Sequence, residues 1–140
     1  MRSISYLPQL LTVVVISTAA VAQTPFPFNR QFVAVSMNGQ DYTTKSPTLT
    51  IKASTNGDAL RGTGFAGCNK WSSRIVLREG QISLGQLGTT RMFCADQMAA
   101  ESNFLDALKS VTHWRMEGSM LVLEGGRTKL LMALAEPNKP

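Results

Sequence analysis

The sequence predicts a mainly β protein, a small antiparallel barrel-like domain of seven to eight strands with one packed α-helix. Two patterns support this fold class. Short segments that alternate polar and apolar residues follow one another along most of the chain, with turn residues between them. One segment departs from this alternation and shows helical periodicity instead. Short strands at this spacing are typical of a barrel or a sandwich.

Alternation defines the strands and their buried faces. In residues 48–53, polar side chains alternate with Leu49 and Ile51, as expected when one face of a strand is buried. In residues 69–77, Trp71 and Ile75 share one face, and the charged residues lie on the other. The predicted strands are 48–53, 60–66, 69–77, 81–84, 112–116, 120–124 and 129–135, with turns at 55–58, 79–80, 118–119 and 125–126.

The last predicted strand has an unusually apolar outer face. Its inward residues are expected to be Leu130, Met132 and Leu134, which leaves Lys129, Leu131, Ala133 and Ala135 facing outward. If this strand lies at a sheet edge, or if the barrel is imperfectly closed, Leu131 is a candidate contact for a second molecule or a partner.

The helix is predicted between residues 95 and 111, where Met98, Phe104 and Leu108 recur at helical spacing. Glu101 falls in the middle of this apolar stripe, so its carboxylate faces the core. A buried carboxylate must be hydrogen-bonded or paired, and the candidate partners are Asn69 and residues 89–91. We expect Glu101 to tie the helix to the barrel. The alternative, an acid in a ligand pocket, has no second catalytic group to support it.

The first 22 residues resemble a secretory signal peptide. Arg2 supplies the positive charge, an apolar segment follows, and the small residues at 20–22 form a cleavage site. The apolar stretch is shorter than the roughly 20 residues of a membrane-spanning helix, so no stable membrane anchor is expected after cleavage. Residues 23–31 are expected to form an extended N-terminal segment, because Pro25 and Pro27 disfavour a helix. These features predict a periplasmic or secreted protein.

Composition excludes several function classes. The chain has 14 Lys and Arg against 9 Asp and Glu, a net charge of +5, without a basic block or a nucleic-acid motif, so no nucleic-acid partner is expected. The one histidine, His113, alternates with Trp114 and is expected to point outward. Motifs for catalysis, phosphate or dinucleotide binding are missing. We therefore predict no enzyme activity, catalytic residue, cofactor or metal site.

The two cysteines, Cys68 and Cys94, are expected to form a disulfide. An even cysteine count in a chain bound for an oxidising compartment favours this pairing. Two free buried thiols are the alternative, and a metal site would need more ligands than two isolated cysteines supply.

Four motifs follow one another along the chain, and they are Gly67-Cys68-Asn69-Lys70-Trp71, Thr90-Arg91-Met92-Phe93-Cys94, Glu101-x-x-Phe104-Leu105-x-x-Leu108 and Gly118-x-x-Leu121-x-Leu123. Their order resembles the META domain family, whose bacterial members include the HslJ-like heat-inducible envelope proteins. The resemblance defines a META-like domain over residues 32–135. Departures occur at Phe32, where tryptophan is usual, and at Ser73 and Ile75, which replace a glycine and a tyrosine.

The resemblance implies a barrel-like β-fold with one helix, located in the periplasm or outer membrane. Members are linked to heat stress, novobiocin tolerance, virulence or motility, and no catalytic residue is established for the family. Asn69, Thr90 and Glu101 are therefore expected to be structural determinants.

Two functions remain open at this level. One is a non-enzymatic envelope protein that acts in stress tolerance or envelope maintenance by binding a partner, an envelope protein of unknown identity. The other is a barrel that carries a small apolar ligand. The filling of the interior distinguishes them, and the residues expected to fill it are the inward leucines with Trp71, Trp114, Met92, Met98, Met116 and Met132.

Overall fold

The computed structural model of the chain describes residues 14–15, 17, 24–43, 45–53 and 59–136. Most of the predicted signal peptide and the turn at 55–58 lie outside the described residues. No helix in these ranges is long and apolar enough to cross a membrane.

Eight strands form a closed antiparallel ring in the order β1, β3, β4, β5, β6, β8, β9, β10, because β10 pairs with β1 as well as with β9. Two short strands, β2 and β7, pair with β1 and β5 outside the ring. The strands are β1 (Gln31–Met37), β2 (Gln40–Asp41), β3 (Thr48–Ala53), β4 (Leu60–Phe65), β5 (Lys70–Arg78), β6 (Gln81–Leu84), β7 (Gly88–Thr89), β8 (His113–Glu117), β9 (Met120–Gly125) and β10 (Thr128–Leu134). The predicted fold class is confirmed.

The closure of the ring is uneven. Neighbouring strands such as β4 and β5 pair over six residues, whereas β6 and β8 pair only at Gln81 and His113. β1 also contains an irregularity between Ala34 and Ser36, where its register with β10 shifts.

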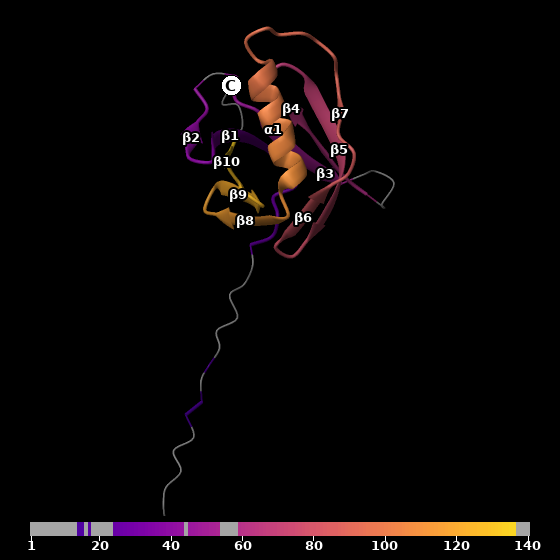
Figure 1. The fold of residues 1–140 in the computed structure, drawn as a ribbon. Coiled ribbons are helices and arrows are strands. Elements are labelled where there is room, and N and C mark those ends of the chain that lie inside the picture. Colours follow the sequence, from indigo (N-terminus) through magenta and orange to yellow (C-terminus); the bar gives the residue numbers. More distant parts are fainter. Residues whose placement is uncertain (1–13, 16, 18–23, 44, 54–58, 137–140) are drawn as a thin grey trace, which may run out of the picture.

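The helix α1 (Met98–Ser110) lies in front of the barrel, and the segment that follows β7 crosses one end of the molecule to reach it (Figure 1). The helix buries Phe104 and Leu108, and the Phe104 ring meets the Trp71 indole edge to face at 6.5 Å between ring centres. It starts three residues later than the periodicity predicts, because residues 95–97 form a turn in which the Gln97 amide donates to the Cys94 carbonyl.

Apolar side chains fill the barrel interior. The largest fully buried side chains of the described residues are Phe32, Phe104, Leu49, Ile51, Leu108, Leu121, Leu123, Leu130, Met132 and Val122. Phe104 and Leu108 come from α1, and Val122 alternates with Leu121 and Leu123, so it faces away from the interior. Trp71 is 2% exposed, and Trp114 and Met116 pack against this core. The expectation for Met92 was wrong, because its side chain is 59% exposed, while Met98 is half-buried.

The N-terminal segment contributes to the core. Phe26 is 6% exposed and lies edge to face with Trp114 at 5.2 Å and beside Phe32 at 5.9 Å. The Asn29 amide donates to the Ile51 carbonyl on β3. Residues 24–30 have no regular secondary structure, as expected, but they are packed as part of the domain, and Gln31 already belongs to β1.

Candidate functional site

The connection between β4 and β5 is a tight corner built from Gly67, Cys68 and Asn69. Gly67 has φ of +116°, a conformation that glycine adopts without strain. The Ala66 amide donates to the Asn69 carbonyl at 2.8 Å and closes the corner. This turn directs the backbone amides of Cys68 and Asn69 toward the first turn of α1.

Glu101 receives these amides. Its Oε2 accepts from the Cys68 amide at 3.1 Å and the Asn69 amide at 2.5 Å, and its Oε1 accepts from Asn69 Nδ2 at 2.8 Å. The residue is 5% exposed and lies in the first helical turn, where a negative charge is favoured. Three donors and the helix N-terminus therefore stabilise this buried carboxylate, and no cation of the described residues forms an ion pair with it.

Asn69 joins the corner to the segment that follows β7. Its Oδ1 accepts from the Met92 amide at 2.7 Å and from Thr90 Oγ1 at 2.9 Å. Its Nδ2 donates to the Met92 carbonyl at 3.1 Å as well as to Glu101. Both donors and both lone pairs of the amide are thus used, so the orientation of the Asn69 side chain is fixed.

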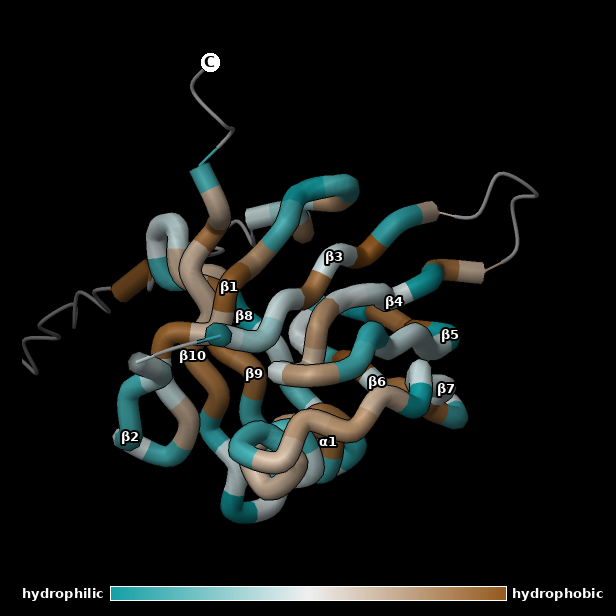
Figure 2. Tube along the Cα trace, turned by 90° about the horizontal axis from the view of Figure 1, so that it is seen from above, coloured by the Kyte–Doolittle hydropathy of each residue, from teal (hydrophilic) through white to brown (hydrophobic). Residues whose placement is uncertain are grey.

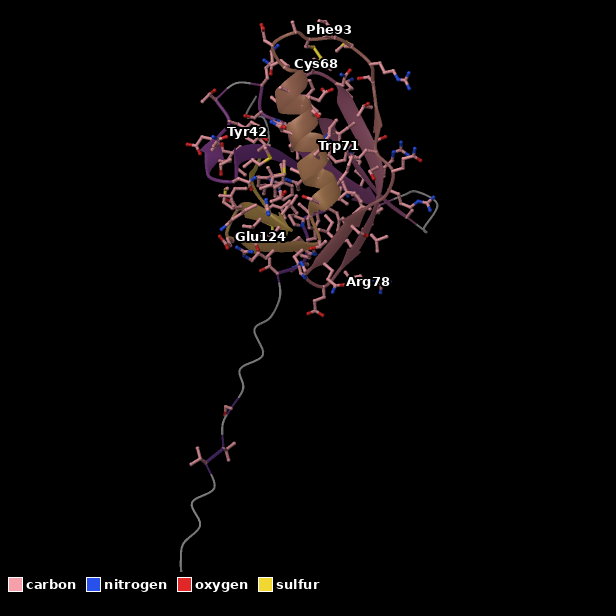
Figure 3. All side chains as sticks on the ribbon, viewed as in Figure 1. Tyr42, Cys68, Trp71, Arg78, Phe93 and Glu124 are labelled. Carbon is pink, nitrogen blue, oxygen red and sulfur yellow. A yellow bond between two sulfur atoms is a disulfide. The ribbon has the colours of Figure 1, made fainter. Side chains whose placement is uncertain are left out.

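The disulfide between Cys68 and Cys94 completes this arrangement and confirms the predicted pairing, with the Cα atoms 5.9 Å apart. Thr90 pairs with Lys70, Met92 is held by Asn69, and Cys94 is bonded covalently, so alternate residues of the 90–94 segment are fixed. Phe93 lies between two of these attachment points, and its side chain is 81% exposed. Figure 3 shows it at one end of the molecule, next to Cys68. We call residues 92 and 93 the apolar tip.

The network itself offers no free chemical group. Both Glu101 oxygens and all four positions of the Asn69 amide are occupied, so these residues support the fold and hold the apolar tip. The structure places Asn69, Thr90 and Glu101 in one network. Thr90 reaches Glu101 only through Asn69, and no hydrogen bond joins Arg91 to Glu101 among the described residues.

Two other residues singled out from the sequence lie elsewhere. Leu131 is half-buried on β10, which pairs with β1 on one side and β9 on the other. It therefore does not lie on an edge strand, and β10 is one of the two strands that close the ring, so neither condition for its contact with a partner is met at this strand. His113 is exposed on β8, and its Nδ1 lies 2.8 Å from Thr112 Oγ1.

Sequence reasoning missed the apolar tip. Residues 90–94 show neither a two-residue nor a helical period, so hydrophobicity alone assigned Met92 to the core. The sequence did contain one usable signal. Met92 and Phe93 lie outside every periodic segment and come directly before Cys94, the cysteine of the predicted disulfide.

These observations define a class of protein, a small closed β-barrel whose helix is joined through a buried carboxylate to a disulfide-linked corner. The META domain family matches residues 24–138, and the chain belongs to this family.

Solved structures share the fold. An NMR structure of a protein from Burkholderia xenovorans is similar with a TM-score of 0.62 and 24% sequence identity, covering 86% of this chain and 97% of that one. A second NMR structure has a TM-score of 0.58 at 24% identity and covers 75% of this chain and 88% of the other. A comparison with curated proteins gave no match.

Proposed function

We propose that this protein is a non-enzymatic binding protein of the bacterial cell envelope, exported by its N-terminal signal, that contacts a protein partner through the apolar tip. The observation that carries the proposal is the exposure of Met92 and Phe93, 59% and 81%, on a segment fixed by Asn69 and the disulfide. A role in stress tolerance or envelope maintenance follows from the resemblance to the heat-inducible envelope proteins.

The physical basis is preorganisation. Burying a phenylalanine that was exposed contributes about 1.5–3 kcal/mol, and a segment that is already ordered loses little entropy on binding. A mobile loop with the same residues would lose part of this gain. The disulfide and the Asn69 bonds therefore increase the affinity that the apolar tip can supply.

The filled interior favours this function over a small-ligand carrier. Phe32, Leu49, Trp71 and Met132 occupy the inside of the ring with at most 2% exposure, and Phe104 of α1 packs into the same core. A carrier barrel needs interior space for its ligand.

The test is site-specific crosslinking in living cells under heat or envelope stress. A photoreactive residue replaces Phe93, and the control carries it at Val76, an exposed apolar position on β5 that is 47% accessible. The crosslinked protein is identified and purified, and its affinity is measured for Phe93→Ser and Val76→Ser. We expect Phe93→Ser to weaken binding about 30-fold, as for a central aromatic contact, and Val76→Ser to change it less than twofold.

Equal effects of the two substitutions would contradict the proposal. Retention of a small apolar molecule by the purified protein, detected by native mass spectrometry, would support the carrier instead.

A further inference from the structure

A polar face lies on the outside of the barrel, over β3, β4 and β5. The backbone register aligns Gln31, Thr50, Thr63 and Ser72 in one row across four neighbouring strands, and the row ends at Gly88 on β7. These residues alternate with the buried ones of their strands, so their side chains lie on the outer surface. We call them the hydroxyl row.

A second row, parallel to the first, consists of cations. Lys52 pairs with Arg61, and Arg61 pairs with Arg74. All three are exposed. Like charges directly opposite each other on neighbouring strands are destabilising, so this row costs stability. We call it the cation row.

Within the described residues, no carboxylate forms an ion pair with these three cations. The ion pairs of the sheet lie instead on β8, β9 and β10, where Arg115 contacts Glu117 and Glu124, and Lys129 contacts Glu124. In the ring order, β9 is opposite β4, so among the described residues the ion-paired charges and the cation row occupy opposite sides of the barrel. This distribution leaves an excess of positive charge on the described part of the β3–β5 face.

The hydroxyl row lies in a surface hollow. A depression of about 690 Å³ is bordered by Thr50, Thr63, Ser72 and Gly88, with Lys70 on its wall. A smaller depression of about 300 Å³ shares Ser72 and Gly88 and is bordered by Arg61 and Arg74. The two depressions therefore meet at Ser72, and Arg61 Nη2 donates to Ser72 Oγ at 3.1 Å where they join. The hydroxyl row, Arg61 and Arg74 therefore line two adjoining depressions, which we call the groove, and Lys52 lies outside them, opposite Arg61.

The polarity of this side is visible in the fold. Seen from above, long hydrophobic runs gather on β1, β9 and β10, whereas β4, β5 and β7 carry more hydrophilic segments (Figure 2). Figure 3 shows Arg78 on the β5 side and Glu124 on the β8–β9 side of the molecule.

We propose that this groove binds an acidic polysaccharide, a glycan chain that carries carboxylate or phosphate groups. The cation row complements the acidic groups, and the threonine, serine and glutamine side chains can both donate to and accept from sugar hydroxyls. The flat surface of a bilayer and the rigid backbone of a DNA duplex offer mainly anionic acceptors and do not enter a recessed row. A single glycan chain can lie along it.

The experiment measures binding of the purified protein to polygalacturonate at about 0.15 M salt, where the Debye length of roughly 8 Å screens distant charges. The test variant carries Lys52→Gln, Arg61→Gln and Arg74→Gln. A matched control carries Lys109→Gln, Arg127→Gln and Lys129→Gln, which removes the same charge outside this face. Thr63→Val removes one hydroxyl and keeps the β-branched shape. Arg74→Gln alone replaces the triple variant if that protein does not fold.

We expect the test variant to bind at least tenfold more weakly, the matched control to stay within twofold of the original protein, and Thr63→Val to lose about threefold. Phe93→Ser should bind polygalacturonate unchanged, so this site and the apolar tip can fail separately. Equal losses in the two triple variants, or no effect of Thr63→Val, would mean net-charge attraction and overturn the proposal. Tighter binding to phosphatidylglycerol vesicles or duplex DNA than to polygalacturonate would overturn it in favour of those ligands.

Discussion

Replacement of Glu101 by alanine is the most direct test of the network that joins the helix to the barrel. The change removes the acceptor of three hydrogen bonds. Asn69 Nδ2 keeps the Met92 carbonyl as a partner, so the backbone amides of Cys68 and Asn69 are the groups left unsatisfied. Each buried unsatisfied donor costs about 1–3 kcal/mol. Part of this cost is offset because a buried charge is also removed, and we expect a net loss of about 3 kcal/mol.

Glutamine at position 101 should cost less, about 1 kcal/mol. Its oxygen can accept from both backbone amides, but its NH₂ group then faces Asn69 Nδ2. Asn69 cannot turn over to offer its oxygen, because Thr90 and the Met92 amide already donate to it. The order of stability is therefore the original protein, then Glu101→Gln, then Glu101→Ala.

The assay is chemical and thermal unfolding with the disulfide intact, and a loss of 3 kcal/mol corresponds to a drop of about 10 °C in melting temperature. A Glu101→Ala protein with unchanged stability and an intact helix would refute this reasoning. Loss of partner binding by Glu101→Gln at unchanged melting temperature would instead assign Glu101 a direct functional role.

Three further perturbations test other parts of the fold. Replacement of both Cys68 and Cys94 by serine should cost about 3.5 kcal/mol, given the 26-residue separation, and chemical unfolding that shows no loss would contradict this. Phe26→Ala should cost about 3–5 kcal/mol because the ring is buried against Trp114 and Phe32, whereas the more exposed Phe28→Ala should cost less in the same assay. The hydrogen bond from Arg115 lowers the pKa of Glu124 below its ordinary 4.5, so this carboxylate stabilises the fold above that pH and the stabilisation is lost as the pH falls through the lowered pKa. Glu124→Gln should therefore lower the melting temperature at pH 7 and leave it unchanged near pH 2.

The fold was predictable where one physical signal dominated. β3 and β6 match their predicted ranges to the residue, because each alternates strictly and a predicted turn flanks one end of each, 55–58 after β3 and 79–80 before β6. The turn glycines Gly80, Gly118 and Gly126 have positive φ, as the predicted hairpins require. The β1 strand had no such signal, since Val33 and Val35 on its outer face are as apolar as Phe32 on its inner face.

The site was predictable in part. The charge of Glu101 in an apolar stripe identified a buried carboxylate, and Asn69 was correctly named as a partner. The backbone amide of Cys68 could not be named, because its direction depends on the positive φ of Gly67. The cation row was also invisible, because it depends on which residues of β3, β4 and β5 stand opposite one another, and alternation within each strand does not fix that register.

The distribution of satisfied and unsatisfied groups indicates where function resides in this barrel. The interior is occupied by apolar side chains, the Asn69 amide has no hydrogen-bonding capacity left, and the buried Glu101 carboxylate already accepts three hydrogen bonds. The proposed recognition of a partner must therefore use exposed groups. Among these, the apolar tip and the cation row each leave a group in an unfavourable environment, an apolar ring in water and like charges side by side. A bound partner would remove the ring from water or neutralise the like charges. A substitution that removes the exposed ring or one of the like charges should therefore raise the stability of the free protein and weaken its binding to the partner. Arg61→Gln is the substitution that tests this relation most directly, because Arg61 lies between Lys52 and Arg74.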